Sequence, residues 1–304
     1  MALLLRRAAG VAGLIAAAFL VVFVLVRVLP GDPVARLVVQ PGVGAAELAT
    51  IRAELGLDRP VAVQLGAYLG AMARGDLGRS LVTGRPVSAE IAARLPATLA
   101  LAGTAFGLAL VLGVGGGAAA AMAGGRVAAA AGTAAAVLGA VPTFASGLFL
   151  IHIFYDRLGI APAPFGAGAG QIVLPALCMA LFAFGPILRI TLGAMAGAIG
   201  GGAIEGARAL GLSGGQTLGN ALRLVAGPVV AVAGPTLAYL IGAGVVVERV
   251  FAWPGVGSYA LDAALAADHA PVQGVVLVLA GCIAVIGGAA AWIAQHLDPR
   301  LGDG

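Results

Sequence analysis

Few side chains in this sequence are of the types that carry out chemistry, and their spacing matches no catalytic or metal-binding motif. The histidines His152, His269 and His296 all fall near the ends of long apolar stretches, where an amphipathic ring is unremarkable. Cys178 and Cys282 lie inside such stretches, as small packing residues do. The chain contains no H-E-x-x-H, C-x-x-C or G-x-S-x-G, and because it contains no lysine it has no P-loop. We therefore predict no catalytic residue, no bound metal and no cofactor held by this chain.

The most distinctive polar segment is E-G-A-R-A-L-G, which runs from Glu205 to Gly211 in a break between two apolar stretches. Glu205 and Arg208 are one helical turn apart while the positions between them are small, so the segment can form a short amphipathic helix. Gly211 is suited to end that helix and Ser213 to begin the next one. Such a helix at a membrane surface is typical of a docking element for a soluble partner, and a plain solvated loop is the alternative.

The composition places these residues in a membrane protein. Apolar residues make up 61% of the chain and charged residues 10%, with a mean hydropathy of +1.06, whereas soluble domains are about 25% charged. The net charge of +4 is not arranged as a basic stripe interleaved with aromatic residues, so nucleic acid is not a predicted partner. The apolar stretches contain no acidic residue in their interiors, which argues against an intramembrane protease or a proton-coupled carrier.

A membrane-crossing helix needs about 20 mostly apolar residues. Arg189 lies near the end of the fourth stretch that qualifies, where its long side chain can reach the interface. The predicted fold class is an all-α polytopic membrane protein with six transmembrane helices and a small extracytoplasmic helical segment between the first two. The six predicted spans are 8–28, 97–122, 127–154, 172–192, 224–247 and 272–294.

Arginines concentrate in the short segments that are cytoplasmic if the N terminus is cytoplasmic, so the positive-inside rule predicts that both termini lie inside. We expect an N-terminal transmembrane helix at 1–29, an extracytoplasmic helical segment at 30–95 and a five-helix transmembrane core at 96–304. The core would carry a cytoplasmic coupling loop at about 196–223. Within the outer segment, a helix is predicted after Pro60, with an apolar stripe formed by Val61, Leu65, Tyr68, Leu69 and Met72.

Several motifs together resemble a known family. The segment from Glu205 to Gly211 resembles the E-A-A-x-x-x-G coupling motif of ABC-importer permeases, with Gly206 in place of an alanine. Residues 245–257 resemble the V-x-E-x-V-F-x-W-P-G-x-G signature of the dipeptide/oligopeptide/nickel class of these permeases. Further matches cover nearly the whole chain in order and indicate the B-type inner-membrane subunit: P-G-D-P (30–33), R-A-E-L-G-L-D-R-P (52–60), R-G-D-L-G-R-S (74–80), R-L-P-A-T-L (94–99) and L-D-P-R (297–300).

The resemblance implies a permease subunit of an ATP-driven importer of di- or oligopeptides, placed as a multi-pass protein in a bacterial inner membrane. Nickel or another small solute is the alternative cargo, and a non-transporting membrane scaffold or an ATP-independent channel is the alternative class. The implied partners are a second homologous permease, two ABC ATPase subunits that use ATP and magnesium, an extracytoplasmic solute-binding protein and membrane lipid.

The resemblance also implies two sets of functional residues. The expected ATPase-coupling residues are Glu205, Gly206, Ala207, Arg208 and Gly211. The expected outer-gate and binding-protein residues are Asp32, Glu248, Phe251, Trp253, Pro254, Gly255 and Gly257. The chain departs from the family pattern in residues 195–203, which are only small or apolar where relatives carry charged residues and tyrosine, so the lead-in to the coupling helix is expected to be flexible.

Overall fold

The computed structural model of the chain describes residues 10, 13, 15–25, 49, 50, 52, 53, 56–160 and 169–297, apart from the side chains of residues 169, 203, 204, 208 and 297. These residues are organised as helices and their connections, and the pairing of extended segments among them is limited to an isolated bridge between Arg79 and Pro86. The prediction of an all-α chain is confirmed for this part of the protein.

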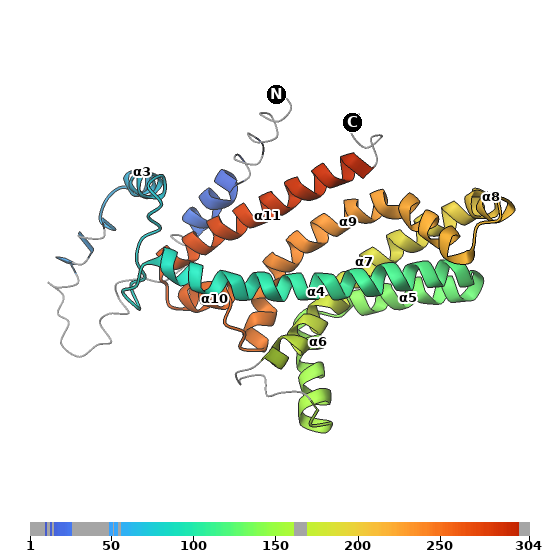
Figure 1. The fold of residues 1–304 in the computed structure, drawn as a ribbon. Helices are drawn as coiled ribbons and strands as arrows, with labels where there is room; N and C mark the ends of the chain where they lie inside the picture. The colour runs from blue at the N-terminus through green and yellow to red at the C-terminus, as the bar shows by residue number, and fades with distance from the viewer. Residues whose placement is uncertain are drawn as a thin grey trace. The chain divides into compact units, whose positions relative to one another are not determined.

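The helices follow one another along the chain with short connections (Figure 1). They are α3 (Val61–Met72), α4 (Val87–Ala123), α5 (Gly125–Ala140), α6 (Thr143–Leu150), the π-helix η2 (Ile151–Arg157), the 3-10 helix η3 (Ala169–Ile172), α7 (Val173–Gly200), α8 (Ala203–Ala209), α9 (Gly214–Val250), α10 (Val256–Leu265) and α11 (His269–Leu297).

Four helical segments in the described residues are long and apolar enough to cross a membrane: Val87–Ala123, Gly170–Gly200, Gly214–Val250 and His269–His296. A fifth crossing is formed if the bent pair of Gly125–Ala140 and Thr143–Arg157 counts as one span. The apolar helix Ile15–Leu25 falls within the predicted first span but is shorter. The chain is therefore a multi-pass membrane protein, and the count of six stays a prediction.

The bent pair has a local cause. The sequence predicts one span over 127–154, but the structure divides it into α5 and α6, which meet at an angle of 94°. Val141 is extended, with φ −72° and ψ 125°, and Pro142 stands immediately before α6. Because the proline ring disfavours a helical conformation at the residue before it, α5 ends at this position.

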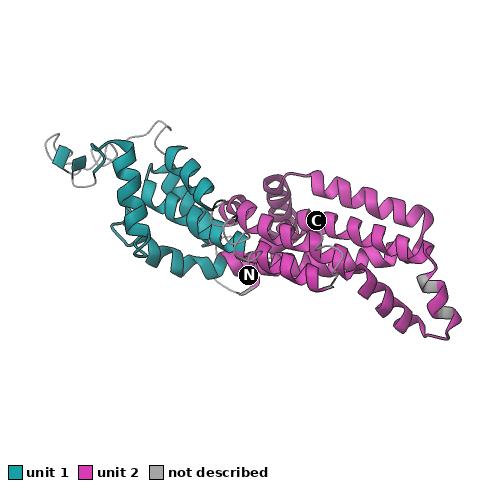
Figure 2. Ribbon diagram, turned by 90° about the horizontal axis from the view of Figure 1, so that it is seen from above, with its two compact units in different colours: residues 1–97, 254–284 teal, residues 98–253, 285–304 magenta. Residues whose placement is uncertain are grey.

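The chain divides into two compact units (Figure 2). The first consists of residues 1–97 and 254–284, and the second of residues 98–253 and 285–304. The chain passes from one unit to the other at three points, of which one lies within α4 and one within α11.

In the second unit, α7 packs against α5, α6, α8 and α9. Small residues allow these helices to approach closely, as is common where helices pack in lipid. A Cβ atom added at Gly185 of α7 would lie 2.9 Å from the carbonyl oxygen of Ala135 on α5. One added at Gly117 of α4 would lie 2.7 Å from the carbonyl oxygen of Leu188 on α7. Neither position has space for a larger side chain.

In the first unit, α3 begins after Pro60, as the sequence predicts. Tyr68, on its predicted apolar stripe, stacks on Phe19 with ring centroids 5.3 Å apart. The start of α11 packs closely on the start of α4, because a Cβ atom added at Gly274 would lie 2.7 Å from Cγ1 of Val87.

Candidate functional site: the coupling segment and the outer turn

The predicted coupling segment forms a sharp helical corner between α7 and α9. Gly211 has a φ of +77°, and the amide of Leu212 donates to the carbonyl of Ala207 at 3.1 Å, as in a glycine-terminated helix end. Ser213 is the N-cap of α9 in a reciprocal capping box with Gln216. The predicted end of α8 and the predicted start of α9 are both confirmed, so α8 has a defined end and the chain a defined direction into α9.

Two side chains of this corner face outward. Glu205 is exposed in the first turn of α8, and Leu210 just after the helix is 83% exposed. Ala207 is half-buried, and α8 packs against α7 and α9. The backbone of Arg208 lies in α8, and its side chain is outside the described residues. Glu205 and Leu210 are thus the acidic and the large apolar side chain that this corner exposes.

The departure from the family pattern at Gly206 has no packing cause in this chain. A Cβ atom added there would have no neighbour within 4 Å among the described residues, so an alanine would fit. In the lead-in at residues 195–203, Gly202 adopts a φ of +75° just before α8, a conformation that favours glycine.

The corner rests on a buried apolar cluster that joins three helices. Thr217 in the first turn of α9 is 5% exposed. The cluster consists of Ala118, Ala121, Met195, Ala221, Val225 and Val229. The ends of α7 and α9 that flank α8 are therefore packed together and not joined by a loose loop.

We expect Gly211→Ala to destabilise the end of α8 by about 1–2 kcal/mol, because a side chain disfavours the left-handed conformation that Gly211 adopts. Gly211→Asn is the matched control, since asparagine tolerates this conformation better. Hydrogen exchange of the α8 amides in nanodiscs measures the effect. Equal exchange in both variants and the wild type would show that the conformation at Gly211 does not hold the corner.

The predicted outer turn follows α9. Glu248 is fully buried, accepts a hydrogen bond from the Thr98 hydroxyl at 2.6 Å, and its carbonyl accepts from the Trp253 amide at 2.7 Å. Phe251 is 3% exposed, and a Cβ atom added at Gly147 of α6 would lie 3.1 Å from its ring. Within this chain, Glu248 and Phe251 thus hold the turn in place from inside.

The remaining predicted outer residues lie in different surroundings. Trp253 is half-buried and Pro254 exposed, whereas Gly255, the N-cap of α10, and Gly257 are buried. Asp32 lies outside the described residues. Pro254 begins the part of the chain that belongs to the first unit. The turn exposes only some of the predicted outer-gate and binding-protein residues. The role of the turn as a gate or as a contact for the binding protein stays a prediction.

A buried polar contact in the first unit was not predicted. The Ser80 hydroxyl donates to the Asp268 carboxylate at 2.6 Å, and the Val82 amide donates to the same oxygen at 3.3 Å. Ser80 and Asp268 are 3% and 2% exposed. Ser80 ends the R-G-D-L-G-R-S motif, but nothing in the sequence connects it with an aspartate 188 residues away. The contact ties the turn before α4 to the connection between α10 and α11.

A second polar group holds the start of α4 in the same unit. Glu90 accepts hydrogen bonds from Arg94 and from Arg85, the latter at 3.1 Å. Arg94 also lies over the ring of Tyr259 on α10, 4.9 Å from its centroid. Burial, followed by the nearby carboxylates of Glu90 and Asp268, raises the pKa of Tyr259, so its hydroxyl stays protonated at neutral pH. Within the described residues, no three His, Cys, Asp or Glu side chains gather closely enough to hold a metal ion.

Comparison with known proteins identifies the family to which the chain belongs. Residues 92–303 match the family described as "Binding-protein-dependent transport system inner membrane component", and residues 1–102 match the N-terminal family of such membrane components. A Brucella abortus (strain 2308) protein, named as a peptide transport system permease protein, is 34% identical over 311 aligned residues, which cover 99% of this chain and 98% of the relative.

Other relatives are named glutathione transport system permease protein GsiC, and two of them serve as examples. The protein from Salmonella paratyphi A is 36% identical over 278 residues, covering 90% of each chain. The protein from Escherichia coli O6:H1 is 35% identical over 273 residues, covering 87% of this chain and 88% of the relative. These matches extend over both units and confirm the resemblance carried by the motifs. The chain belongs to the family of binding-protein-dependent transport system inner membrane components, the permease subunits of ABC importers.

Proposed function

We propose that this chain is one half of the membrane path of an ATP-driven importer of short peptides. The relatives named for peptide and for glutathione transport support this cargo, since glutathione is itself a short peptide. The working assembly would contain a second homologous permease, two ATPase subunits and an extracytoplasmic solute-binding protein. This chain would hold no cofactor, and the ATPase subunits would bind ATP and magnesium.

The proposed topology has six spans with both termini in the cytoplasm of a bacterial cell. The arginine bias of the short loops supports this topology. The described residues supply five crossings if the bent pair counts as one span, and the predicted first span would be the sixth. Residues 1–29 would form the first span, 30–95 the extracytoplasmic segment and 96–304 the core. In this topology α8 faces the cytoplasm, and the turn after α9 faces the outside.

The observation that carries the proposal is the corner around α8. Both ends of the short helix are defined by backbone geometry, its base is packed, and it presents Glu205 and Leu210 to solvent. Seated in a groove of an ATPase subunit, it would transmit closure of the ATPases into α7 and α9. The spans would then alternate between inward-facing and outward-facing arrangements. Glu205, Gly206, Ala207, Arg208 and Gly211 are the residues proposed for coupling.

The outer turn is proposed as the contact for the binding protein and as part of the outer closure. Trp253 and Pro254 would be its accessible residues, together with Asp32. Glu248 and Phe251 would act indirectly, by holding the turn, and Gly255 and Gly257 by allowing it to fold back into α10.

The test of the coupling assignment is co-purification of the permease with its ATPase subunits from membranes. We expect Glu205→Arg to reduce the retained ATPase at least tenfold, because replacing an interface hot spot typically costs about 2 kcal/mol or more. Leu210→Asp is a second variant at the same surface. Asp156→Arg, in η2, is the control, since it makes the same charge reversal at another exposed carboxylate.

Uptake of a labelled dipeptide into proteoliposomes, dependent on the binding protein and ATP, should fall in parallel with ATPase retention. If the wild type retains no ATPase, or if Glu205→Arg retains as much as the wild type, the coupling proposal is wrong and the scaffold or channel reading is favoured. Uptake of nickel in place of the dipeptide would replace the proposed cargo and leave the coupling assignment intact.

A further inference from the structure

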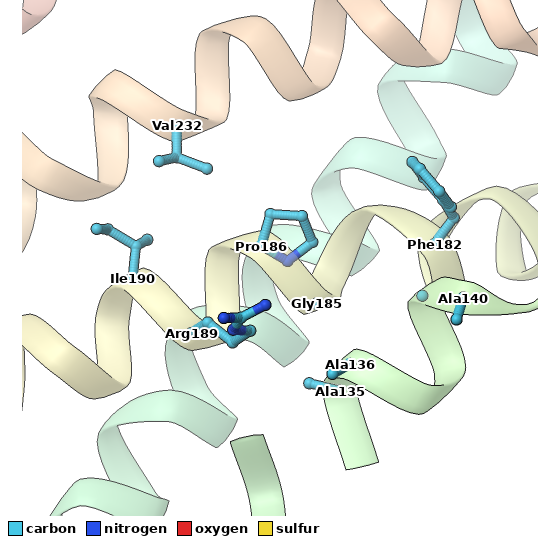
Figure 3. Close-up of a pocket in the computed structure, with 10 residues that line it drawn as sticks. Ala135, Ala136, Ala140, Phe182, Gly185, Pro186, Arg189, Ile190 and Val232 are labelled. Atoms are coloured by element: carbon cyan, nitrogen blue, oxygen red, sulfur yellow. The ribbon is translucent and has the colours of Figure 1, made fainter. Parts of the chain in front are cut away.

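A cavity of about 620 Å³ that is open to the surface of the chain lies in the second unit, between α5, α7 and α9 (Figure 3). Its volume is in the range of small-molecule sites in proteins. The walls are small or apolar, with Phe182, Pro186 and Ile190 from α7 and Val232 from α9. Among its lining residues only Arg189 carries a charge. Figure 3 shows this side chain extending alongside Gly185.

The helix that carries Arg189 is longer than the predicted fourth span. The fourth apolar stretch ends at residue 192, which places Arg189 near the interface, but α7 continues without a break to Gly200. At 1.5 Å per residue, the eleven residues beyond Arg189 amount to about 16 Å of helix. Arg189 thus lies eleven residues before the end of α7, its side chain is exposed in this chain, and it is the only residue of α7 with a formal charge.

No hydrogen bond or ion pair to Arg189 is formed by the residues that the structure describes. The described carboxylates of the second unit are engaged or placed elsewhere: Glu248 with Thr98, Asp156 with His152, and Glu205 on the surface of α8. An uncompensated charge within a membrane span is costly, so such residues characteristically face a water-filled path and mark a functional site.

A second cavity, of about 750 Å³, continues from the first along α5 and α7, and both are lined by Arg189 and Ala136. The cation thus stands where the two cavities meet. Of the large exposed residues of α5, Val127 and Leu138 lie on the face of that helix opposite Ala136 at 100° per residue, and Val137 lies about 100° from it. Such residues suit lipid, and two of the three point away from the cavities.

We propose that Arg189 binds the terminal carboxylate of a peptide during its passage through the permease. A guanidinium presents two parallel donors that match a carboxylate. The other lining residues are small or apolar, so they would not select among the side chains of different peptides. Every linear peptide carries this carboxylate whatever its sequence, so one cation suffices for varied peptides. The same charge repels nickel ions. This inference rests on the proposed peptide cargo.

The test uses the assembled transporter in phosphatidylcholine nanodiscs, without binding protein, and with Cys178→Ala and Cys282→Ala as background. Ala136→Cys introduces a thiol beside Arg189. Its rate of modification by a thiol reagent is measured against increasing dialanine and against dialanine amide, which lacks the carboxylate. We expect dialanine to protect the thiol at a concentration about tenfold lower than the amide, as for one charge-assisted contact.

Adding Arg189→Gln should abolish the difference between the two peptides, and Arg189→Lys should keep part of it. Arg126→Gln, which removes an exposed arginine at the start of α5, is the control and should keep it all. Equal protection by the two peptides, or none by either, overturns the inference. Protection by anionic lipid in place of dialanine would assign Arg189 to a lipid headgroup and also overturns it.

Dipeptide uptake by the wild-type transporter is measured in parallel to separate the two proposals. If the wild type takes up no dipeptide, the proposed cargo itself fails. If uptake is present while protection does not depend on the carboxylate, only the assignment of Arg189 fails.

Discussion

Gly117→Leu is expected to lower the free energy of unfolding of the permease by about 3 kcal/mol, at the upper end of what overpacking usually costs. A Cβ atom at this position would lie 2.7 Å from the carbonyl oxygen of Leu188 and 2.8 Å from Cβ of Thr191, so α4 and α7 would have to separate. The measurement is the midpoint of thermal unfolding in detergent, followed as loss of the monodisperse fraction.

Gly115→Leu is the matched control for this prediction. It lies on the same helix two residues away, but an added Cβ atom would have no neighbour within 4 Å in the described part of the chain. The control should unfold within a few degrees of the wild type. If both variants lose stability equally, the cause is the loss of glycine from α4 and not the close approach of two helices.

Glu248→Leu is expected to destabilise the protein by about 1–3 kcal/mol, because it removes the buried acceptor of the Thr98 hydroxyl. Thr98→Val, which removes the donor, should cost a similar amount. Replacing both partners should cost clearly less than the sum of the two, since neither polar group is then left without the other. Thermal unfolding of the four proteins completes the double-mutant cycle.

Glu248→Gln is the conservative control, since it keeps an oxygen that can accept from Thr98. This variant should retain most of the stability and also the binding-protein stimulation of ATP hydrolysis. Additive costs in the cycle would show that Glu248 and Thr98 act independently and that their hydrogen bond does not hold the outer turn.

The sequence alone was sufficient for the class of the protein and for the local geometry of its coupling corner. Lipid excludes charged and unpaired polar groups, so the sequence shows which stretches can cross the membrane without any knowledge of tertiary contacts. The corner around Gly211 and Ser213 depends on hydrogen bonds that span only a few residues, and its cap signals therefore predict it correctly. The bend at Pro142 was equally local, and the long apolar run concealed it.

Only the tertiary structure decided which distant residues meet. Thr98 and Glu248 are 150 residues apart, and Ser80 and Asp268 are 188 apart, so no periodicity or local spacing could pair them. The surroundings of Arg189 were also beyond the sequence, because its cavity is formed jointly by α5, α7 and α9. Composition determines that a helix enters the membrane, but the approach of other helices determines whether its charge faces lipid, protein or a path.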